Sequence, residues 1–365
     1  LARQHYATFQ RMLEGMDVRV AILTGASKAR ERREALAGIA DGSIDLLIGT
    51  HALIEDRVQF SNLGFVVIDE QHRFGVEQRA RLWTKNEQPP HILVMTATPI
   101  PRTLAMTLYG DLDVSVIDEL PPGRQPIRTV HYTDAARLRL FGFMRQEIKK
   151  GRQIYVVYPL IKESETMDYK DLQDGYEAIS RDFPLPEYVT TICHGKMKPE
   201  DKEESMRQFK SGEANIMVAT SVIEVGVDVP NATVMVIESA ERFGLSQLHQ
   251  LRGRVGRGSQ QSYCILMSGE KLSKEARLRL EAMCETNDGF RLAELDLKLR
   301  GAGDVNGTLQ SGMAFDLKIA NPTLDSQILT VTREAAAEVL TADPTLTQNG
   351  HEGLRELRKR YSGRE

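Results

Sequence analysis

The sequence has 365 residues, 41% of them hydrophobic and 27% charged, with a formal net charge of −4. The length suits two globular domains, and no apolar run is long enough to cross a membrane as a helix. The slightly acidic balance argues against a general electrostatic binder of nucleic acid, although local basic patches would still allow DNA binding. Cys193, Cys264 and Cys284 lie far apart within apolar patterns. They are therefore expected to be buried reduced thiols of a cytoplasmic protein rather than disulfide or zinc ligands.

The first third of the chain alternates between short apolar runs and charged segments. Ser27 is expected to cap a charged helix that ends near Asp41 and Gly42. Strands that alternate with helices predict a parallel α/β sheet with right-handed connections. The strands of this lobe are expected at residues 18–24, 44–49, 65–69, 92–96 and 114–117.

A second α/β lobe is expected after a linker rich in proline and glycine. Pro199 should begin a helix that ends near Ser211 and Gly212, whereas the acidic residues 162–175 are interpreted as a surface loop. The strands of the second lobe are expected at residues 154–158, 189–192, 216–219, 234–237 and 263–267.

Beyond the last of these strands, apolar residues recur at helical spacing and predict a helical hairpin. A glycine-rich loop, residues 301–307, should follow it, and charged helical segments should end the chain. The hairpin is marked by Ala276, Leu280 and Met283, a turn at Asn287–Gly289, and then Leu292, Leu295 and Leu299.

Two acids end the apolar run Val66–Ile68. Such a run is typical of a parallel strand buried on both faces, and ligands bind beyond the carboxyl ends of these strands. Asp69 is therefore a candidate ligand of Mg²⁺, directly or through its waters, and Glu70 a candidate to polarise a water that attacks a γ-phosphate. Taken alone, these residues fit a polar strand end that has no catalytic role at least as well as they fit a nucleotide site.

The segment Gln247–Arg257 is predicted to be a helix with apolar and polar faces. Gln250, Arg254 and Arg257 would share the polar face, where arginines can neutralise charge on a transferring phosphoryl group. Gly253 and Gly256 would each cost the helix about 1 kcal/mol, which suggests close approach to another lobe. The alternative is a surface helix with three solvated polar residues.

These two segments, together with Gly49-Thr50-His51 and Thr96-Ala97-Thr98, form an ordered set that resembles helicase superfamily 2. The resemblance implies two RecA-like parallel-sheet lobes, ATP and Mg²⁺ as cofactors, and Arg254 and Arg257 as arginine fingers. The positions implied to contact the nucleotide are Asp69, Glu70, His72, Gly226, Asp228, Gln250, Arg254 and Arg257. Those implied to contact nucleic acid are Thr50, Thr96, Thr98 and Thr220, although a threonine at a strand end is often a local cap.

A closer resemblance, over essentially all of residues 1–320, is to the RecG family of ATP-dependent DNA helicases. It is carried by Asp69–Val76, Thr96–Ala105, Gly110–Asp113, Leu120–Arg124 and Leu295–Gly301. The family implies remodelling of stalled forks and Holliday junctions, and an N-terminal wedge domain outside this sequence. It also implies a hydrogen-bonding group of Arg279, Arg300 and Gln310 that couples hydrolysis to translocation.

No Gly-x-x-x-x-Gly-Lys-Ser/Thr phosphate loop occurs in the 365 residues. We therefore expect the chain to be the C-terminal part of a longer motor, with an N-terminally incomplete first lobe. A transcription-repair coupling translocase and a catalytically silent nucleic-acid-binding or protein-binding module remain the alternatives. The expected parts are the partial first lobe (1–120), linker (121–130), second lobe (131–270), hairpin and translocation loop (271–315) and helical tail (316–365).

Overall fold

The computed structural model describes residues 1–55, 57–69, 88–96, 114–117, 119–159, 165–220, 229–300 and 326–361. The described residues divide into two compact units, which are considered separately. The larger unit contains the described residues of 1–96 and 119–296, and the smaller unit contains 114–117, 297–300 and 326–361. Within the described residues, no helix is both long enough and apolar enough to span a membrane.

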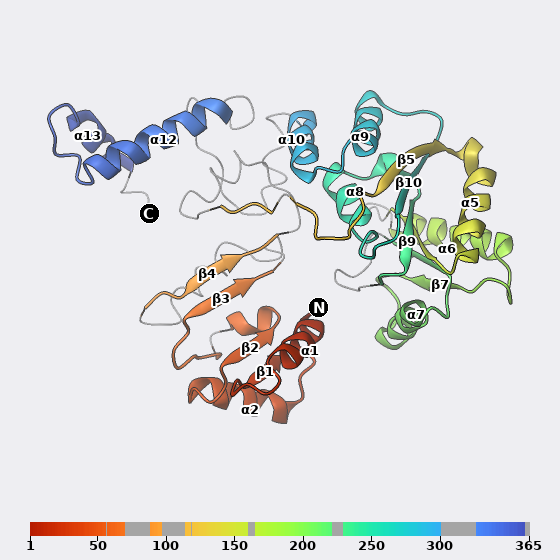
Figure 1. Cartoon of the computed structure of the whole chain (residues 1–365), viewed down its shortest axis with the longest axis horizontal. Helices are drawn as coiled ribbons and strands as arrows, with labels where there is room; N and C mark the ends of the chain where they lie inside the picture. The colour runs from red at the N-terminus through yellow and green to blue at the C-terminus, as the bar shows by residue number, and fades with distance from the viewer. Residues whose placement is uncertain are drawn as a thin grey trace. The chain divides into compact units, whose positions relative to one another are not determined.

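The first lobe contains short parallel strands and their helices, as the alternating pattern predicts. In its described part β1 pairs with β2, and β3 pairs with β4, as two separate parallel ladders (Figure 1). The elements are α1 (Ala2–Met12), β1 (Val20–Leu23), α2 (Ala29–Ala40), β2 (Leu46–Gly49), η1 (His51–Ile54), β3 (Phe65–Ile68) and β4 (His91–Val94).

Two expectations for this lobe are wrong. Ser27 does not cap α2, because its hydroxyl accepts the Thr24 N–H at 3.0 Å and closes the preceding turn, so that Lys28 is the N-cap. Residues 114–117 form no strand, and Ile117 is 93% exposed. Among the described residues no strand pairs with this run.

The second lobe is a six-stranded parallel sheet in the order β5-β10-β9-β6-β8-β7. The strands are β5 (Arg128–Thr133), β6 (Gln153–Tyr158), β7 (Thr190–Cys193), β8 (Ile216–Thr220), β9 (Ala232–Ile237) and β10 (Tyr263–Ser268). The helices are η3 (Asp134–Ala136), α5 (Arg137–Lys149), α6 (Glu165–Asp182), α7 (Pro199–Ser211), η4 (Ala240–Arg242) and α8 (Leu245–Arg252).

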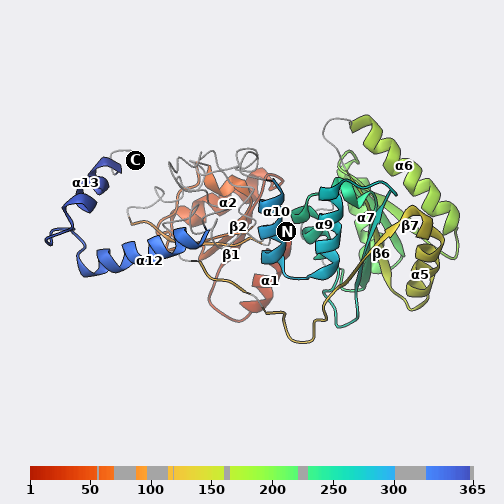
Figure 2. The same ribbon diagram turned by 90° about the horizontal axis from the view of Figure 1, so that it is seen from above.

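Both faces of this sheet are covered, which accounts for the continuous apolar strands. Helices α5 and α6 cover one face and α7 covers the other (Figure 2). Ile154 and Val156 of β6 point to the face that packs with α5 and α6, whereas Tyr155 points to the other face. There its ring lies 4.7 Å from that of Phe209 on α7. The alternation of side chains along each strand therefore builds two core layers.

The predicted parallel α/β fold is confirmed, with two local corrections. β5 begins at Arg128, within the expected linker 121–130, because its partner β10 accepts it in register from Tyr263 onward. Residues 165–175, expected to be loop, belong to α6. The buried Leu172 and Ile179 show that this acidic helix presents an apolar stripe to the sheet.

The predicted hairpin is confirmed as α9 (Lys274–Glu285) and α10 (Gly289–Arg300). Each helix begins at a side-chain cap: Ser273 Oγ accepts the Ala276 N–H at 3.1 Å, and Asp288 Oδ1 accepts the Phe290 N–H at 2.9 Å. Of the cysteines, Cys193 and Cys264 are buried as expected, but Cys284 on α9 is exposed.

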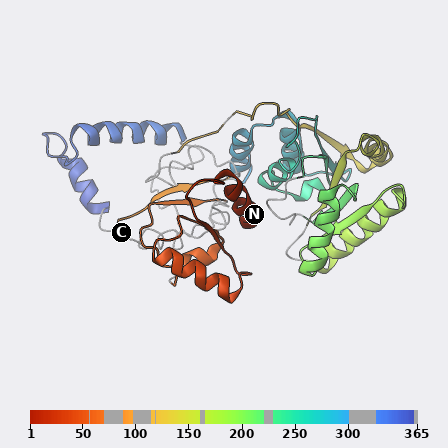
Figure 3. The same ribbon diagram turned by 60° about the horizontal axis from the view of Figure 1, so that its bottom comes forward.

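The smaller unit includes α12 (Ser326–Ala342) and α13 (Glu352–Tyr361), consistent with the predicted helical tail. Asp343 fixes the loop between them by accepting the Gln348 N–H at 2.8 Å and lying 2.9 Å from His351 Nδ1. Figure 3 shows this helix–loop–helix arrangement in blue.

Candidate functional site

Asp69 lies directly after β3, at the carboxyl end of the strand, as the sequence predicts. Its side chain is 38% exposed, and Oδ2 lies 3.8 Å from His5 Nε2 on α1. An accessible carboxylate at this edge fits Mg²⁺, which prefers oxygen ligands and keeps several waters. Glu70 and His72, which are expected beside it, lie outside the described residues.

Two of the four threonines expected to contact nucleic acid are exposed at strand ends of the first lobe. Because β3 and β4 are parallel and in register, Thr96 lies at the same sheet edge as Asp69. Thr50 is exposed immediately after β2, in the other ladder. Thr98 lies outside the described residues.

In the second lobe, Thr220 is the last residue of β8 and is completely buried. Its hydroxyl has no hydrogen-bond partner in the part of the chain that the structure describes. A buried hydroxyl does not contact a nucleic-acid strand, so this conformation does not present Thr220 for its expected role. Gly226 and Asp228, expected near the nucleotide, lie outside the described residues.

The predicted helix Gln247–Arg257 ends earlier than expected, and its proposed polar face is wrong. α8 ends at Arg252, with Gly253 as the C-cap. Gly256 has a φ of 79°, a left-handed conformation that glycine adopts without strain. The two glycines therefore end the helix and shape a turn rather than interrupt a continuous helix.

Gln250 consequently lies on α8, whereas Arg254 and Arg257 are carried by the turn after it. Both arginines are partly exposed, while Val255 between them is 2% exposed. A turn with a buried apolar residue at its centre can still hold two cations toward a ligand. The role expected of the arginines stays a prediction, and the local structure that carries them differs from the predicted helix.

Arg252 is a residue that the sequence motifs do not single out. Its side chain is 2% exposed, although arginine is among the residues least often fully buried. A signal is present in the sequence: Arg252 stands four residues after Leu248, on the apolar face of α8. Charged residues at such positions need internal partners.

Arg279 of α9 is the one member of the expected coupling group whose side-chain contacts fall within the described residues. Its Nη2 donates to the main-chain oxygen of Glu241 at 2.9 Å, which ties α9 to η4. Its Nε is buried and has no partner among the described residues. The side chain of Arg300 and all of Gln310 lie outside the described part, so the predicted group stays a prediction.

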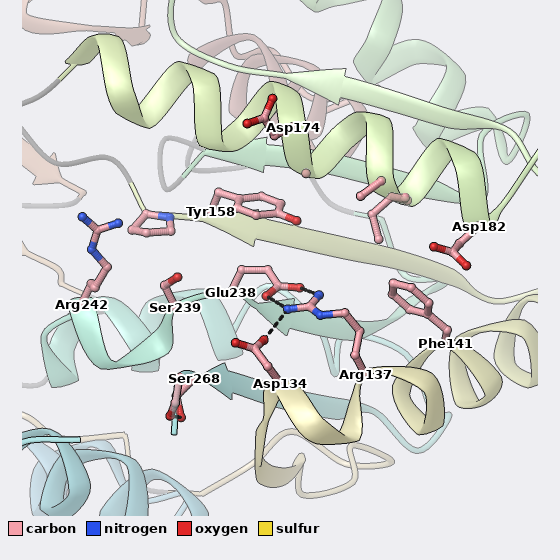
Figure 4. Close-up of a pocket in the computed structure, with 15 residues that line it drawn as sticks. Asp134, Arg137, Phe141, Tyr158, Asp174, Asp182, Glu238, Ser239, Arg242 and Ser268 are labelled. Atoms are coloured by element: carbon pink, nitrogen blue, oxygen red, sulfur yellow. Dashed lines mark hydrogen bonds and ion pairs between the residues drawn. The ribbon is translucent and has the colours of Figure 1, made fainter. Parts of the chain in front are cut away.

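A polar pocket of about 380 Å³ lies at the carboxyl ends of β5, β6, β9 and β10. Within it Arg137 donates to both carboxylate oxygens of the buried Glu238, at 2.7 and 2.9 Å, and to Asp134 at 2.7 Å (Figure 4). The hydrogen bond from Arg137 to Glu238 raises the pKa of Arg137. This pairing joins the segments that follow β5 and β9, and none of the described residues that line the pocket is an expected site residue.

Three sequence families match successive parts of the chain. Residues 1–107 match the DEAD/DEAH box helicases, and residues 137–259 match the helicase conserved C-terminal domain. Residues 286–361 match the C-terminal part of domain 3 of the ATP-dependent DNA helicase RecG.

Curated relatives extend this similarity over nearly the whole chain. The ATP-dependent DNA helicase RecG of Synechocystis is 51% identical over 95% of the chain and 41% of the relative. The proteins of the same name are 49% identical over 94% of the chain in Bacillus subtilis and 46% over 93% in Escherichia coli K12. The chain spans about half the length of these curated relatives.

Solved structures show similarity to the same family and to the wider helicase fold. RecG bound to a three-way DNA junction superposes with a TM-score of 0.70 at 43% identity, covering 90% of this chain and 42% of that one. Yeast Dbp5 bound to RNA and ADP BeF3 gives a TM-score of 0.54 at 13% identity, covering 82% and 78%. The second similarity shows a shared fold alone.

Proposed function

Because the chain belongs to the RecG family of ATP-dependent DNA helicases, we propose that it forms the motor portion of a helicase or translocase. The observation that carries the proposal is the identity of 46–51% over 93–95% of the chain. The proposed substrate is branched DNA, such as stalled forks and Holliday junctions. It is supported by the solved relative bound to a three-way junction.

ATP and Mg²⁺ are the proposed cofactors. When bound, Mg²⁺ would neutralise charge on the β- and γ-phosphate oxygens. Asp69 is the described candidate to hold it, because its carboxylate is accessible at the carboxyl end of β3. Glu70 would orient the attacking water, and His72 would contact the nucleotide.

The second lobe would supply positive charge to the same reaction. Arg254 and Arg257 would stabilise the transferring phosphoryl group, a role worth roughly 10³–10⁵ in rate for arginine fingers. Gln250 on α8, with Gly226 and Asp228, would complete the nucleotide contacts. The turn geometry supports this assignment, because it leaves both arginines partly exposed.

Contacts to DNA and their coupling to hydrolysis are proposed for other residues. Thr50, Thr96 and Thr98 would contact the strand, and Thr220 would do so only in a conformation that exposes it. Arg279, Arg300 and Gln310 would couple hydrolysis to movement. An N-terminal wedge domain and a phosphate loop of the same protein would complete the machine, which we place in the cytoplasm.

A comparison of two arginines tests the proposal in the protein extended to the length of its relatives. Arg257→Ala should remove most DNA-stimulated ATP hydrolysis. Arg300→Ala should retain hydrolysis and lose junction unwinding, because it changes coupling alone. Arg33→Ala, on the exposed surface of α2, is the matched control. Full hydrolysis in Arg257→Ala would contradict the finger role. Proportional loss of both activities in Arg300→Ala would leave it a helix-capping residue.

A further inference from the structure

The guanidinium of Arg252 joins the end of α8 to the turn between α9 and α10. Nη1 donates to the carbonyls of Met283 at 3.0 Å and Thr286 at 2.8 Å, and Nη2 donates to the carbonyl of Asn287 at 3.3 Å. Nη1 also lies 3.5 Å from Thr129 Oγ1 on β5. One buried side chain therefore contacts β5, the last turn of α9 and the residues that precede α10.

Among the described residues, main-chain carbonyls and not a carboxylate accept hydrogen bonds from this cation. The carbonyls of Met283 and Thr286 belong to the C-terminal end of α9, where carbonyls lack intrahelical partners and carry the negative end of the helix dipole. Arginine keeps its proton when buried, so the carbonyls and the cation satisfy one another. The arrangement requires the planar, forked donor set of arginine.

His249, one turn earlier on α8, completes the set. Its Nδ1 lies 2.9 Å from Nη2 of Arg252, and it must accept this hydrogen bond because a guanidinium has only donors. Burial, and then the charge of Arg252, lower the pKa of His249 to about 4. The imidazole is therefore neutral at neutral pH, as the geometry requires.

The acceptor side of the contact is itself fixed. Thr286 Oγ1 accepts the Asp288 N–H at 3.0 Å, and Asp288 Oδ1 accepts the N–H of Phe290 and, at 3.4 Å, that of Arg291. These bonds define the backbone between α9 and α10. The α9–α10 turn therefore has hydrogen bonds of its own beside those that it accepts from Arg252.

The backbone that carries Arg254 and Arg257 begins directly after Arg252. Arg254 N–H donates to Leu251 O at 3.0 Å, and Val255 N–H donates to Arg252 O at 3.3 Å. Gly256 lies so close to Ile127 that an added Cβ would be 2.9 Å from Ile127 Cγ1. The arginine-bearing turn is consequently held at both ends, by Arg252 and by Ile127.

We propose that Arg252 is a positioning residue. It holds the end of α8 against the α9–α10 turn, and it thereby determines where residues 253–257, which follow α8, place Arg254 and Arg257. The inference rests on the proposed role of these two arginines in ATP hydrolysis. It assigns to the α9–α10 turn a part in building the nucleotide site. Arg252 itself touches no reacting atom in this scheme.

The test uses the protein extended to the length of its relatives, with Arg252→Gln, Arg252→Lys and the control Arg277→Gln. Arg277 is an exposed arginine on α9. Misplacement of a catalytic group by about 1 Å costs roughly 10²-fold, so Arg252→Gln should lower kcat for ATP by roughly ten- to a hundredfold. KM should change little, because the arginines act on the transition state. Arg252→Lys, which keeps the charge but loses the fork, should be intermediate.

Two further measurements separate positioning from general stability. Arg252→Gln should cause no additional loss in a background that carries both Arg254→Ala and Arg257→Ala, because both residues through which it acts are then absent. Hydrogen exchange in Arg252→Lys should be faster at residues 253–257 and 286–289 and unchanged in β6 and β8. This exchange readout does not depend on activity, and it applies if Arg252→Gln fails to fold.

Turnover in Arg252→Gln equal to that of Arg277→Gln, beside a loss in Arg257→Ala, would overturn the positioning role alone. A further loss on adding Arg252→Gln to the Arg254→Ala, Arg257→Ala background would also overturn it, as would exchange that rises equally in β6 and β8. Full turnover in Arg257→Ala would instead remove the proposed function on which the inference rests.

Discussion

His249 shows how a single residue can make the stability of the second lobe depend on pH. Its pKa falls from 6.5 to about 4 on folding, so the unfolded chain binds the proton first as the pH decreases. Stability is therefore present above about pH 6.5 and is lost progressively as the pH falls toward 4. The full loss from this group is on the order of 3 kcal/mol.

His249→Gln should weaken this pH dependence, because the amide oxygen can accept from Arg252 but does not titrate. Urea midpoints followed by circular dichroism at about pH 7.5 and about pH 5 would measure the difference. Burial also lowers the pKa values of His131 and His194, so both proteins should still lose some stability in acid. Identical pH profiles of the two proteins would contradict the assignment to His249.

For single residues, the sequence predicts the position of a side chain on its strand or helix better than it predicts the groups that the side chain contacts. Asp69 is expected at a strand end from its neighbours alone, and the structure places it there. The contacts of Arg252 cannot be predicted in this way, because its carbonyl partners lie 31 to 35 residues further along the chain. Only the return of α9 and α10 to the end of α8 brings these groups together.

Among the elements, α5 and α7 carry two glycines for which replacement by alanine should have opposite effects on stability. Gly212 ends α7 with a φ of 82°, where an added Cβ is strained although it meets no neighbouring atom. Gly142 lies inside α5, where its Cβ position is open. Gly212→Ala should destabilise the chain by about 1 kcal/mol, whereas Gly142→Ala should stabilise it by about 0.5–1 kcal/mol. Urea denaturation of both variants checks the signs, and a change in the same direction would contradict this account.

The same physics explains which elements can be predicted from the sequence. The strands of the second lobe are predictable because burial on both faces leaves continuous apolar runs, such as Ile216–Thr220 of β8. The start of α6 cannot be predicted in this way, because polar residues outnumber the apolar residues of the stripe that contains Leu172 and Ile179. α8 is predicted too long because helical spacing continues through Gly253 and Gly256, whose backbone conformation the spacing does not reveal.

For the whole molecule, the two lobes differ in how well their described strands are enclosed. In the second lobe β6, β8, β9 and β10 each lie between two neighbouring strands, and their residues are almost entirely buried. In the described part of the first lobe every strand pairs with one neighbour. Large apolar side chains remain 40–59% exposed on β3, on β4 and just after it: Phe65, Val67, Leu93 and Met95.

Amide hydrogen exchange should therefore be faster in residues 1–118 than in residues 130–268. An amide in an interior strand exchanges only when a large buried unit opens, whereas a two-stranded ladder with an exposed apolar face opens at lower free energy. Within this comparison, β3 and β4 should exchange faster than β6 and β9 by a factor that reflects the difference in opening free energy.

The same measurement tests whether another segment or chain covers the first lobe. Equal protection of β3 and β6 would mean that another segment or a partner chain covers Phe65, Val67 and Leu93, because exposed apolar surface of this kind is otherwise a site of association. Adding a segment that covers these side chains should then slow exchange in the first lobe and leave β6 and β9 unchanged.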